Sequence, residues 1–162
     1  MSDTSTMVFI DPAARVEIRA LDPGLDEDAA GILAAATGAD TIERGREVLG
    51  ELCGLFAGGD LVAVYGLRRA STANEVTYLA VKAGVRRKGY GRACLRDALR
   101  RSGQRPLVAE TDEGGVAFYK ACGFKLVGRR THPSGTVRYR LGWHAPGLRF
   151  KGGSTAAVRT RP

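Results

Sequence analysis

A basic loop that contains two glycines constrains this chain more than any other segment. Residues 82–91 join a β-branched and aromatic run, residues 75–81, to residues 91–101, whose apolar side chains fall on one helical face. This pattern predicts a strand, a turn and a helix in immediate succession. A helix N-terminus has free N–H groups and a partial positive charge, and glycine leaves them accessible. The junction is therefore predicted to hold phosphate groups.

Three side chains in this loop could strengthen such a site. Arg86, Arg87 and Lys88 offer charge-assisted hydrogen bonds, each worth about 1.5–3 kcal/mol when well formed. A solvated basic loop with an ordinary glycine turn is the alternative. A P-loop is excluded because the string G-x-x-x-x-G-K-[ST] does not occur. The dinucleotide fingerprint lacks its third glycine, where Cys94 stands, although Glu110 lies about 20 residues onward, where its ribose-binding acid would be.

Periodicity and turn residues indicate the remaining elements. Strands are expected at residues 16–20, 55–57, 61–65, 75–81, 107–110, 124–127 and 136–141, and helices at residues 27–36, 41–52, 91–101 and 116–122. This order predicts an α/β (α+β) fold with about four helices and a mixed, mostly antiparallel sheet of six to seven strands. The fourth and fifth strands, joined by a helical crossover, should be parallel.

Length and composition set the domain organisation. The chain has 162 residues, of which 44% are hydrophobic, enough for one compact domain. We expect that domain at residues 15–143, after a flexible segment at 1–14 and before a basic, mobile tail at 144–162. No apolar stretch approaches the roughly 20 residues that span a bilayer, and the N-terminal residues lack a basic-then-apolar signal pattern. A cytoplasmic location without membrane contact is therefore expected.

The cysteine and charge content excludes some functions and leaves others open. Three cysteines at wide spacings and two histidines indicate neither a disulfide framework nor a metal site, so the cysteines are expected to be small packed side chains. The formal net charge of +8 attracts polyanions of every kind. Charge alone therefore does not distinguish a phosphate-rich cofactor from nucleic acid.

The loop resembles the R/Q-x-x-G-x-G/A signature of the GCN5-related N-acetyltransferases (GNAT), with Arg86, Gly89 and Gly91 at the defining positions. The order of elements over about residues 16–142 is also similar to that of the family. The resemblance implies an enzyme that uses acetyl-CoA as co-substrate, without a metal. It also implies an amine acceptor.

The resemblance further implies how the donor binds. The fourth and fifth strands would splay apart, and the pantetheine arm would pair with the fourth strand at Leu79 and Val81. Both residues are equally compatible with ordinary core positions. Backbone amides of the loop would face the pyrophosphate. The expected cofactor contacts are Leu79, Val81, Arg86, Arg87, Lys88, Gly89, Tyr90, Gly91, Arg92 and Asp112.

A second block, residues 112–124, resembles the family segment N-x-x-A-x-x-x-Y-x-x-x-G-F through Tyr119, Gly123 and Phe124. The resemblance places at Tyr119 the acid that protonates the departing thiolate. An ordinary phenol giving a proton to an ordinary thiolate goes uphill by about 2 kcal/mol, so moderate assistance is expected. A helix aromatic packed in the core is the alternative for Tyr119.

The amine must also lose a proton, which calls for a base. Glu110, at the end of the fifth predicted strand, is the first candidate, and Glu75 and Asp112 follow it. A solvated charge or a helix cap is the alternative for such an acid. Asp112 replaces the asparagine usual in the family and Gly115 replaces its alanine. An aspartate can cap a helix N-terminus, but it would repel a nearby phosphate.

Three functions are compatible with the sequence. The first is an N-acetyltransferase that moves an acetyl group from acetyl-CoA to a primary amine of a small molecule or peptide, by direct attack and without a covalent enzyme intermediate. The second is a non-catalytic acyl-CoA sensor or interaction module of the same fold, suggested by Asp112 and Gly115. The third is a basic nucleic-acid-binding domain, suggested by the net charge and by Arg92, Arg96, Arg100 and Arg101 on one helix. Either a monomer or a homodimer is compatible with the sequence.

Overall fold

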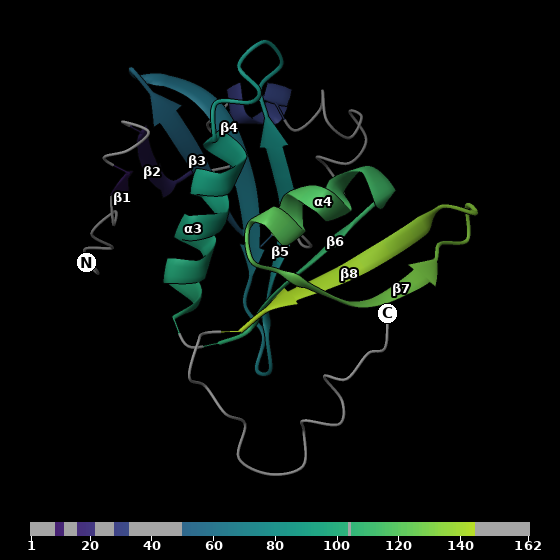
Figure 1. Cartoon of the computed structure of the whole chain (residues 1–162). Helices are drawn as coiled ribbons and strands as arrows, with labels where there is room; N and C mark the ends of the chain where they lie inside the picture. The colour runs from purple at the N-terminus through teal and green to yellow at the C-terminus, as the bar shows by residue number, and fades with distance from the viewer. Residues whose placement is uncertain (1–8, 12–15, 22–27, 33–49, 104, 145–162) are drawn as a thin grey trace. The chain divides into compact units, whose positions relative to one another are not determined.

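Strands dominate the computed structural model, which describes residues 9–11, 16–21, 28–32, 50–103 and 105–144 (Figure 1). The strands are β1 (Phe9–Asp11), β2 (Val16–Ala20), β3 (Glu51–Ala57), β4 (Asp60–Arg68), β5 (Asn74–Val81), β6 (Leu107–Thr111), β7 (Lys125–Thr131) and β8 (Val137–Trp143). The helices are α3 (Tyr90–Ser102) and α4 (Glu113–Ala121), and residues 28–32 form a further helical segment.

The strands divide between two compact units that share β5. The first unit comprises residues 1–69 and 76–101, and its strand order is β1-β2-β3-β4-β5, with antiparallel pairing from β1 to β4. The second unit comprises residues 70–75 and 102–162. Its order is the start of β5, then β6, β8 and β7, with β8 antiparallel to both neighbours. β5 and β6, the fourth and fifth strands expected from the sequence, are parallel, so the mixed, mostly antiparallel α/β fold is confirmed.

The sheet has eight strands, more than the six to seven expected. The additional strand is β1, which lies inside the segment at residues 1–14 that was expected to be flexible. Its Phe9 and Asp11 stand opposite Ile18 and Val16 of β2. Three residues are too few to give a periodic signal, and only the pairing with β2 defines the strand.

The prediction of a helix at residues 41–52 is wrong at its end, because β3 begins at Glu51. Leu52 and Cys53 are buried in β3, and Cys53 pairs with Tyr65 of β4, so sheet pairing and burial override the local helix propensity. Residues 41–49 lie outside the described residues. So do residues 33–36 of the first predicted helix, residue 27 at its start, and residues 145–162 of the predicted tail.

The core of the first unit surrounds the β3–β4 hairpin. All seven residues from Leu61 to Leu67 are buried, as expected of a central strand. One apolar cluster joins the helical segment to these strands and consists of Ala29, Ile32, Leu52, Leu61, Val64 and Ala80, with Leu21, Phe56 and Tyr78 packed against it. Cys53 and Cys94 are buried and Cys122 is half-buried, and all three are free thiols, as expected.

A buried carboxylate connects α3 to this hairpin. Asp97 is fully buried, and it accepts a 2.6 Å hydrogen bond from the Tyr65 hydroxyl of β4. Arg100 and Arg101 each donate to Asp97 at 2.7 Å, and Arg101 also pairs with Glu51 of β3 at 3.1 Å. Figure 1 shows α3 beside β3 and β4. The network joins the helix to both strands. The buried negative charge is thus compensated by two guanidinium groups and one hydroxyl.

Removing this carboxylate should destabilise the fold strongly. In Asp97→Ala, the guanidinium of Arg101 loses its buried partner, and the expected loss in the free energy of unfolding is about 3–5 kcal/mol, measured by urea denaturation. Glu17→Ala is the control, since its ion pair with Arg19 is exposed and should contribute at most about 1 kcal/mol. Equal effects of the two substitutions would contradict the structural role of Asp97.

Candidate functional site

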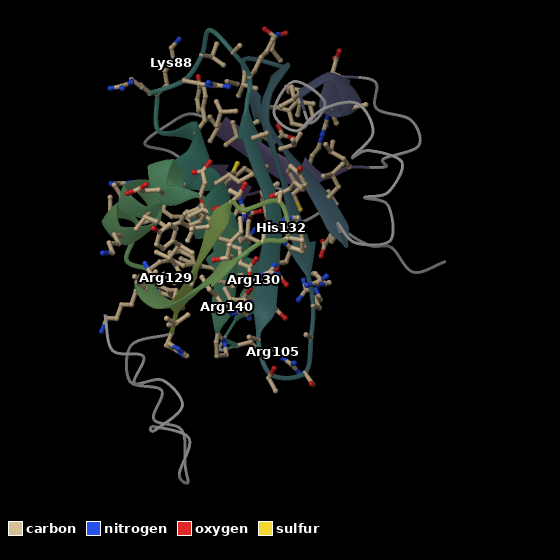
Figure 2. All side chains as sticks on the ribbon, turned by 90° about the vertical axis from the view of Figure 1, so that its right-hand side faces the viewer. Lys88, Arg105, Arg129, Arg130, His132 and Arg140 are labelled. Carbon is tan, nitrogen blue, oxygen red and sulfur yellow. The ribbon has the colours of Figure 1, made fainter. Side chains whose placement is uncertain are left out.

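The basic loop between β5 and α3 is anchored at its start. The Lys82 N–H donates to the Val62 carbonyl of β4 at 2.8 Å, and the Val85 N–H donates back to the Lys82 carbonyl at 3.3 Å. The chain therefore leaves the sheet immediately after Val81 and turns. Lys88 is exposed in this loop (Figure 2).

The loop backbone repeatedly enters the left-handed region. Gly84, Arg87 and Gly89 have φ angles of 88°, 65° and 82°. Arg87 is the one residue other than glycine with positive φ among those that the structure describes. Such a conformation is strained for a residue with a side chain, and strained backbone concentrates at functional sites.

The helix that follows starts in a way that suits an anion. The Gly89 carbonyl accepts from the Ala93 N–H at 3.0 Å, which makes Gly89 the residue that precedes the first helical turn. The first turn of α3 contains no acidic residue that could compete with a bound anion. A phosphate at this end would meet the positive end of the helix dipole.

The side chains of the loop are disposed for contact with solvent or a ligand. Arg86, Arg87 and Lys88 are exposed, and the Arg86 Nε lies 3.5 Å from the Val81 carbonyl oxygen, to which it donates. Arg92 is also exposed. Gly89 is exposed. The other predicted cofactor residues of this unit are partly buried: Leu79, Val81, Tyr90 and Gly91.

The start of α4 shows the local roles of Asp112 and Gly115, the two departures from the family pattern. Asp112 caps the helix, because its Oδ1 accepts from the Gly115 N–H at 3.1 Å, as the sequence predicted for an aspartate here. A Cβ atom on Gly115 would collide with the side chain of Thr111. Glycine therefore stands where the family has alanine because Thr111 occupies the space that a methyl group would need.

Tyr119 is buried in the second unit. Its ring packs edge-to-face against Phe118 and Phe124, with centroids 5.2 Å and 5.5 Å away. Burial raises the pKa of Tyr119 to about 12. The aromatic packing fits the core alternative for this residue, and the raised pKa keeps its hydroxyl protonated at neutral pH.

Glu110 is bound by arginines. Arg130 donates to both carboxylate oxygens, at 3.2 Å and 2.8 Å, while Arg140 lies 3.7 Å from Oε1 and Arg138 donates to the Glu110 backbone carbonyl at 3.2 Å. The hydrogen bonds from Arg130, with the positive charges of all three arginines, lower the pKa of Glu110. The carboxylate is therefore ionised at neutral pH, but its affinity for a proton is reduced.

The predicted site residues fall into two groups. The β5–α3 junction of the first unit carries the basic loop predicted to contact the cofactor, and the β6–α4 segment of the second unit carries Glu110, Asp112 and Tyr119. The arginines around Glu110 were not predicted. The alternation of Arg138 and Arg140 along β8 is a period-two signal that could have identified two of them.

Two further features concern metals and membranes. Within the described ranges, no group of three or more histidine, cysteine, aspartate or glutamate side chains is placed to hold a metal ion. None of the helices in the described part of the chain is long and apolar enough to cross a membrane.

Several solved structures of acetyltransferases have a similar fold. A Bacillus subtilis acetyltransferase in complex with CoA shares 20% identity and a TM-score of 0.68 over 80% of this chain and 98% of that one. A GNAT family acetyltransferase from Elizabethkingia anophelis with bound acetyl-CoA shares 18% identity and a TM-score of 0.68, over 80% and 97%. The ribosomal-protein-S18-alanine N-acetyltransferase of Escherichia coli shares 19% identity and a TM-score of 0.64, over 83% and 99%. At these identities the likeness shows a common fold.

The sequence itself identifies the family, which the similarity of fold does not. Residues 44–126, just over half of the 162 residues, match the model of the acetyltransferase (GNAT) domain. The chain therefore belongs to the GNAT acetyltransferase family. No curated protein shows a significant match to the sequence.

The Glu110 ion pair should make the free energy of unfolding depend on pH in the acidic range. The pKa of Glu110 is depressed in the folded protein, so its contribution to stability is complete above its ordinary pKa of 4.5 and is lost as the pH falls through the folded-state pKa. In Arg130→Gln, the pKa of Glu110 should rise toward 4.5 and the acid loss of stability should be smaller. NMR titration of the carboxyl and denaturation from about pH 7 to about pH 3 measure both effects.

Arg129→Gln is the matched control for this titration. Arg129 is exposed and stands opposite Tyr139, whereas Arg130 stands opposite Arg138. Its removal should leave the titration of Glu110 unchanged. A Glu110 pKa that stays the same in Arg130→Gln would show that the ion pair does not control this carboxyl.

Proposed function

We propose that this protein is an N-acetyltransferase that moves the acetyl group of acetyl-CoA to a primary amine of a small molecule or peptide. The observation that carries the proposal is the loop before α3, where positive φ angles, a helix N-terminus without acidic residues and three exposed cationic side chains coincide. Membership of the GNAT acetyltransferase family supports acyl transfer, and two structural neighbours contain CoA or acetyl-CoA.

In this proposal the donor is bound mostly by the first unit. Backbone N–H groups from Arg87 to Arg92 hold the pyrophosphate, and the side chains of Arg86 and Lys88 add charge-assisted contacts. The pantetheine arm pairs with the backbone of β5 near Leu79 and Val81. This mode of binding needs main-chain groups and a proline-free strand, and β5 contains no proline.

The chemistry proposed is direct attack of a neutral amine on the thioester carbonyl. The carbon–sulfur bond breaks as the carbon–nitrogen bond forms, and a backbone amide near Val81 stabilises the developing oxyanion. Tyr119 gives its proton to the departing thiolate. With a tyrosine pKa of about 12 and an ordinary thiol pKa of about 8.5, this transfer is uphill by about 5 kcal/mol, so Tyr119 assists only as the thiolate develops full charge.

Glu110 is proposed to accept the proton of the attacking amine through a water molecule. Its side chain is 19% exposed, and its lowered pKa keeps it ionised under all but acidic conditions. The same lowered pKa makes it a weak base. Its contribution is therefore expected to consist largely of orienting the water and attracting the cationic form of the acceptor.

The test is release of CoA from acetyl-CoA in the presence of amine panels, combined with calorimetric measurement of CoA binding. Binding with release supports the proposal. Binding without release from any acceptor would favour an acyl-CoA sensor instead, and the shifts in the pKa values of Tyr119 and Glu110 make this the leading alternative. The absence of both binding and release would overturn the proposal.

Changing the loop conformation should weaken donor binding. In Gly89→Ala, a φ angle of 82° becomes strained by about 1–2 kcal/mol, and relaxation of the loop would misdirect its N–H groups. The dissociation constant for CoA should rise about tenfold or more. Gly59→Ala is the control, because its φ of 87° gives similar strain in the β3–β4 turn. A smaller effect of Gly89→Ala on CoA binding than that of the control would contradict the role of the loop.

Removing the Tyr119 hydroxyl should separate catalysis from binding. Tyr119→Phe retains the aromatic packing with Phe118 and Phe124, so stability and CoA affinity should change little, whereas kcat should fall about tenfold to a hundredfold. Tyr139→Phe, a change of the same kind on β8, should leave kcat unaltered. An unchanged kcat in Tyr119→Phe would assign this residue to the core alone.

A further inference from the structure

One face of the sheet in the second unit carries a cluster of opposite charges. The register places Glu110 of β6 opposite Arg140 of β8, and Arg130 of β7 opposite Arg138. Residues opposite each other in an antiparallel pair point to the same face, as do residues two apart in one strand. These four residues therefore share one face, which we call the arginine face. Figure 2 shows Arg130 and Arg140 on the β7–β8 hairpin.

The arginines of this face keep unused capacity for binding. Arg130 uses two nitrogens on the Glu110 carboxylate, and Arg138 uses one on the Glu110 backbone carbonyl. Arg140 lies 3.7 Å from the carboxylate, as an ion pair. A guanidinium carries five N–H donors, so each arginine has donors beyond these contacts.

Two arginine side chains of this face are more exposed than the carboxylate beside them. The side chains of Arg130 and Arg140 are 62% and 45% exposed, and that of Glu110 is 19% exposed. A ligand that approaches from solvent therefore meets guanidinium groups before it meets the carboxylate. Two planar groups beside one another suit a carboxylate, which guanidinium recognises with paired hydrogen bonds.

The balance of charge limits the kind of ligand. Three arginines are opposed by two carboxylates, Glu110 and Glu75. The hydrogen bonds and charge of Glu110 raise the pKa of Arg130, and the charge of Glu75 raises it further. Nucleic-acid binding needs several cations that neutralise successive phosphates, and this face offers too little excess charge. Adjacent positive and negative groups instead complement a small molecule that carries both charges.

We infer that the amine acceptor is a zwitterion of the amino-acid type, with its carboxylate on Arg130 and Arg140 and its amine directed to Glu110. The inference rests on the proposed acetyl transfer, in which Glu110 takes the amine proton. Glu110 then has two effects: it holds Arg130 in place and it attracts the ammonium group before the proton is lost. The arginines select acceptors with a carboxylate next to the amine.

The first measurement compares acids with amides of the same side chain. CoA release is followed with the common L-amino acids and with their carboxamides, which retain the amine and lose the negative charge. The acid should have a kcat/KM about tenfold higher or more, mainly through a lower KM. Equal use of acids and amides would overturn the inference and leave the acetyltransferase proposal standing.

The second measurement does not depend on turnover. Calorimetry with CoA present compares binding of N-acetylated amino acids with binding of their amides. The acetylated acids should bind about tenfold more tightly to the unmodified protein. Arg130→Gln and Arg140→Gln should each abolish the difference, and Arg140→Lys should restore part of it. CoA binding without discrimination between acid and amide would overturn the inference, whereas loss of CoA binding and CoA release would overturn the proposed function itself.

Arg129→Gln is the control that distinguishes this face from general positive charge. It removes the same charge from the neighbouring position of β7, which pairs with Tyr139 rather than with Arg138. The preference for acids should persist in this variant. Equal loss of the preference in Arg129→Gln and Arg140→Gln would assign the effect to net charge and would also overturn the inference.

Discussion

The buried carboxylate of Asp97 is the interaction on which the first unit depends. An ionised group in an apolar interior is costly unless its charge and its hydrogen-bonding capacity are both satisfied. Tyr65, Arg100 and Arg101 satisfy both, and Arg101 extends the contact to Glu51. α3 is thereby fixed to β3 and β4 in one orientation. Because the basic loop that we propose to bind phosphate leads into this same helix, the direction of its N–H groups is defined only while the helix stays packed on the sheet.

The sequence predicted those features of the site that arise locally. The helix that follows the glycine-containing basic loop and the aspartate cap of α4 were predictable, because both depend on a few adjacent residues. β1 and the true start of β3 were not predictable in this way. Both depend on pairing with strands distant in the sequence, and burial at Leu52 and Cys53 outweighs what the segment would prefer alone.

The environment of Glu110 also depends on strand pairing that the sequence does not reveal. A carboxylate at a strand end was recognised as a candidate base, but its basicity depends on Arg130 and Arg140, which are 20 and 30 positions away in the chain. Only the strand register brings them together. Tyr119 is similar, because the aromatic packing that raises its pKa depends on how α4 and Phe124 meet. The sequence identified the carboxylate and the phenol as candidate groups, whereas their pKa values depend on contacts that only the fold creates.

The contact between Gly115 and Thr111 changes the meaning of the departures from the family pattern. Since the threonine side chain fills the space of a Cβ atom, the two positions form a compensated pair, and each residue restricts what the other can be. Alanine at position 115 would be accommodated only with a smaller residue at position 111. The departure at position 115 is therefore explained by local volume at the junction of strand and helix, without reference to catalysis.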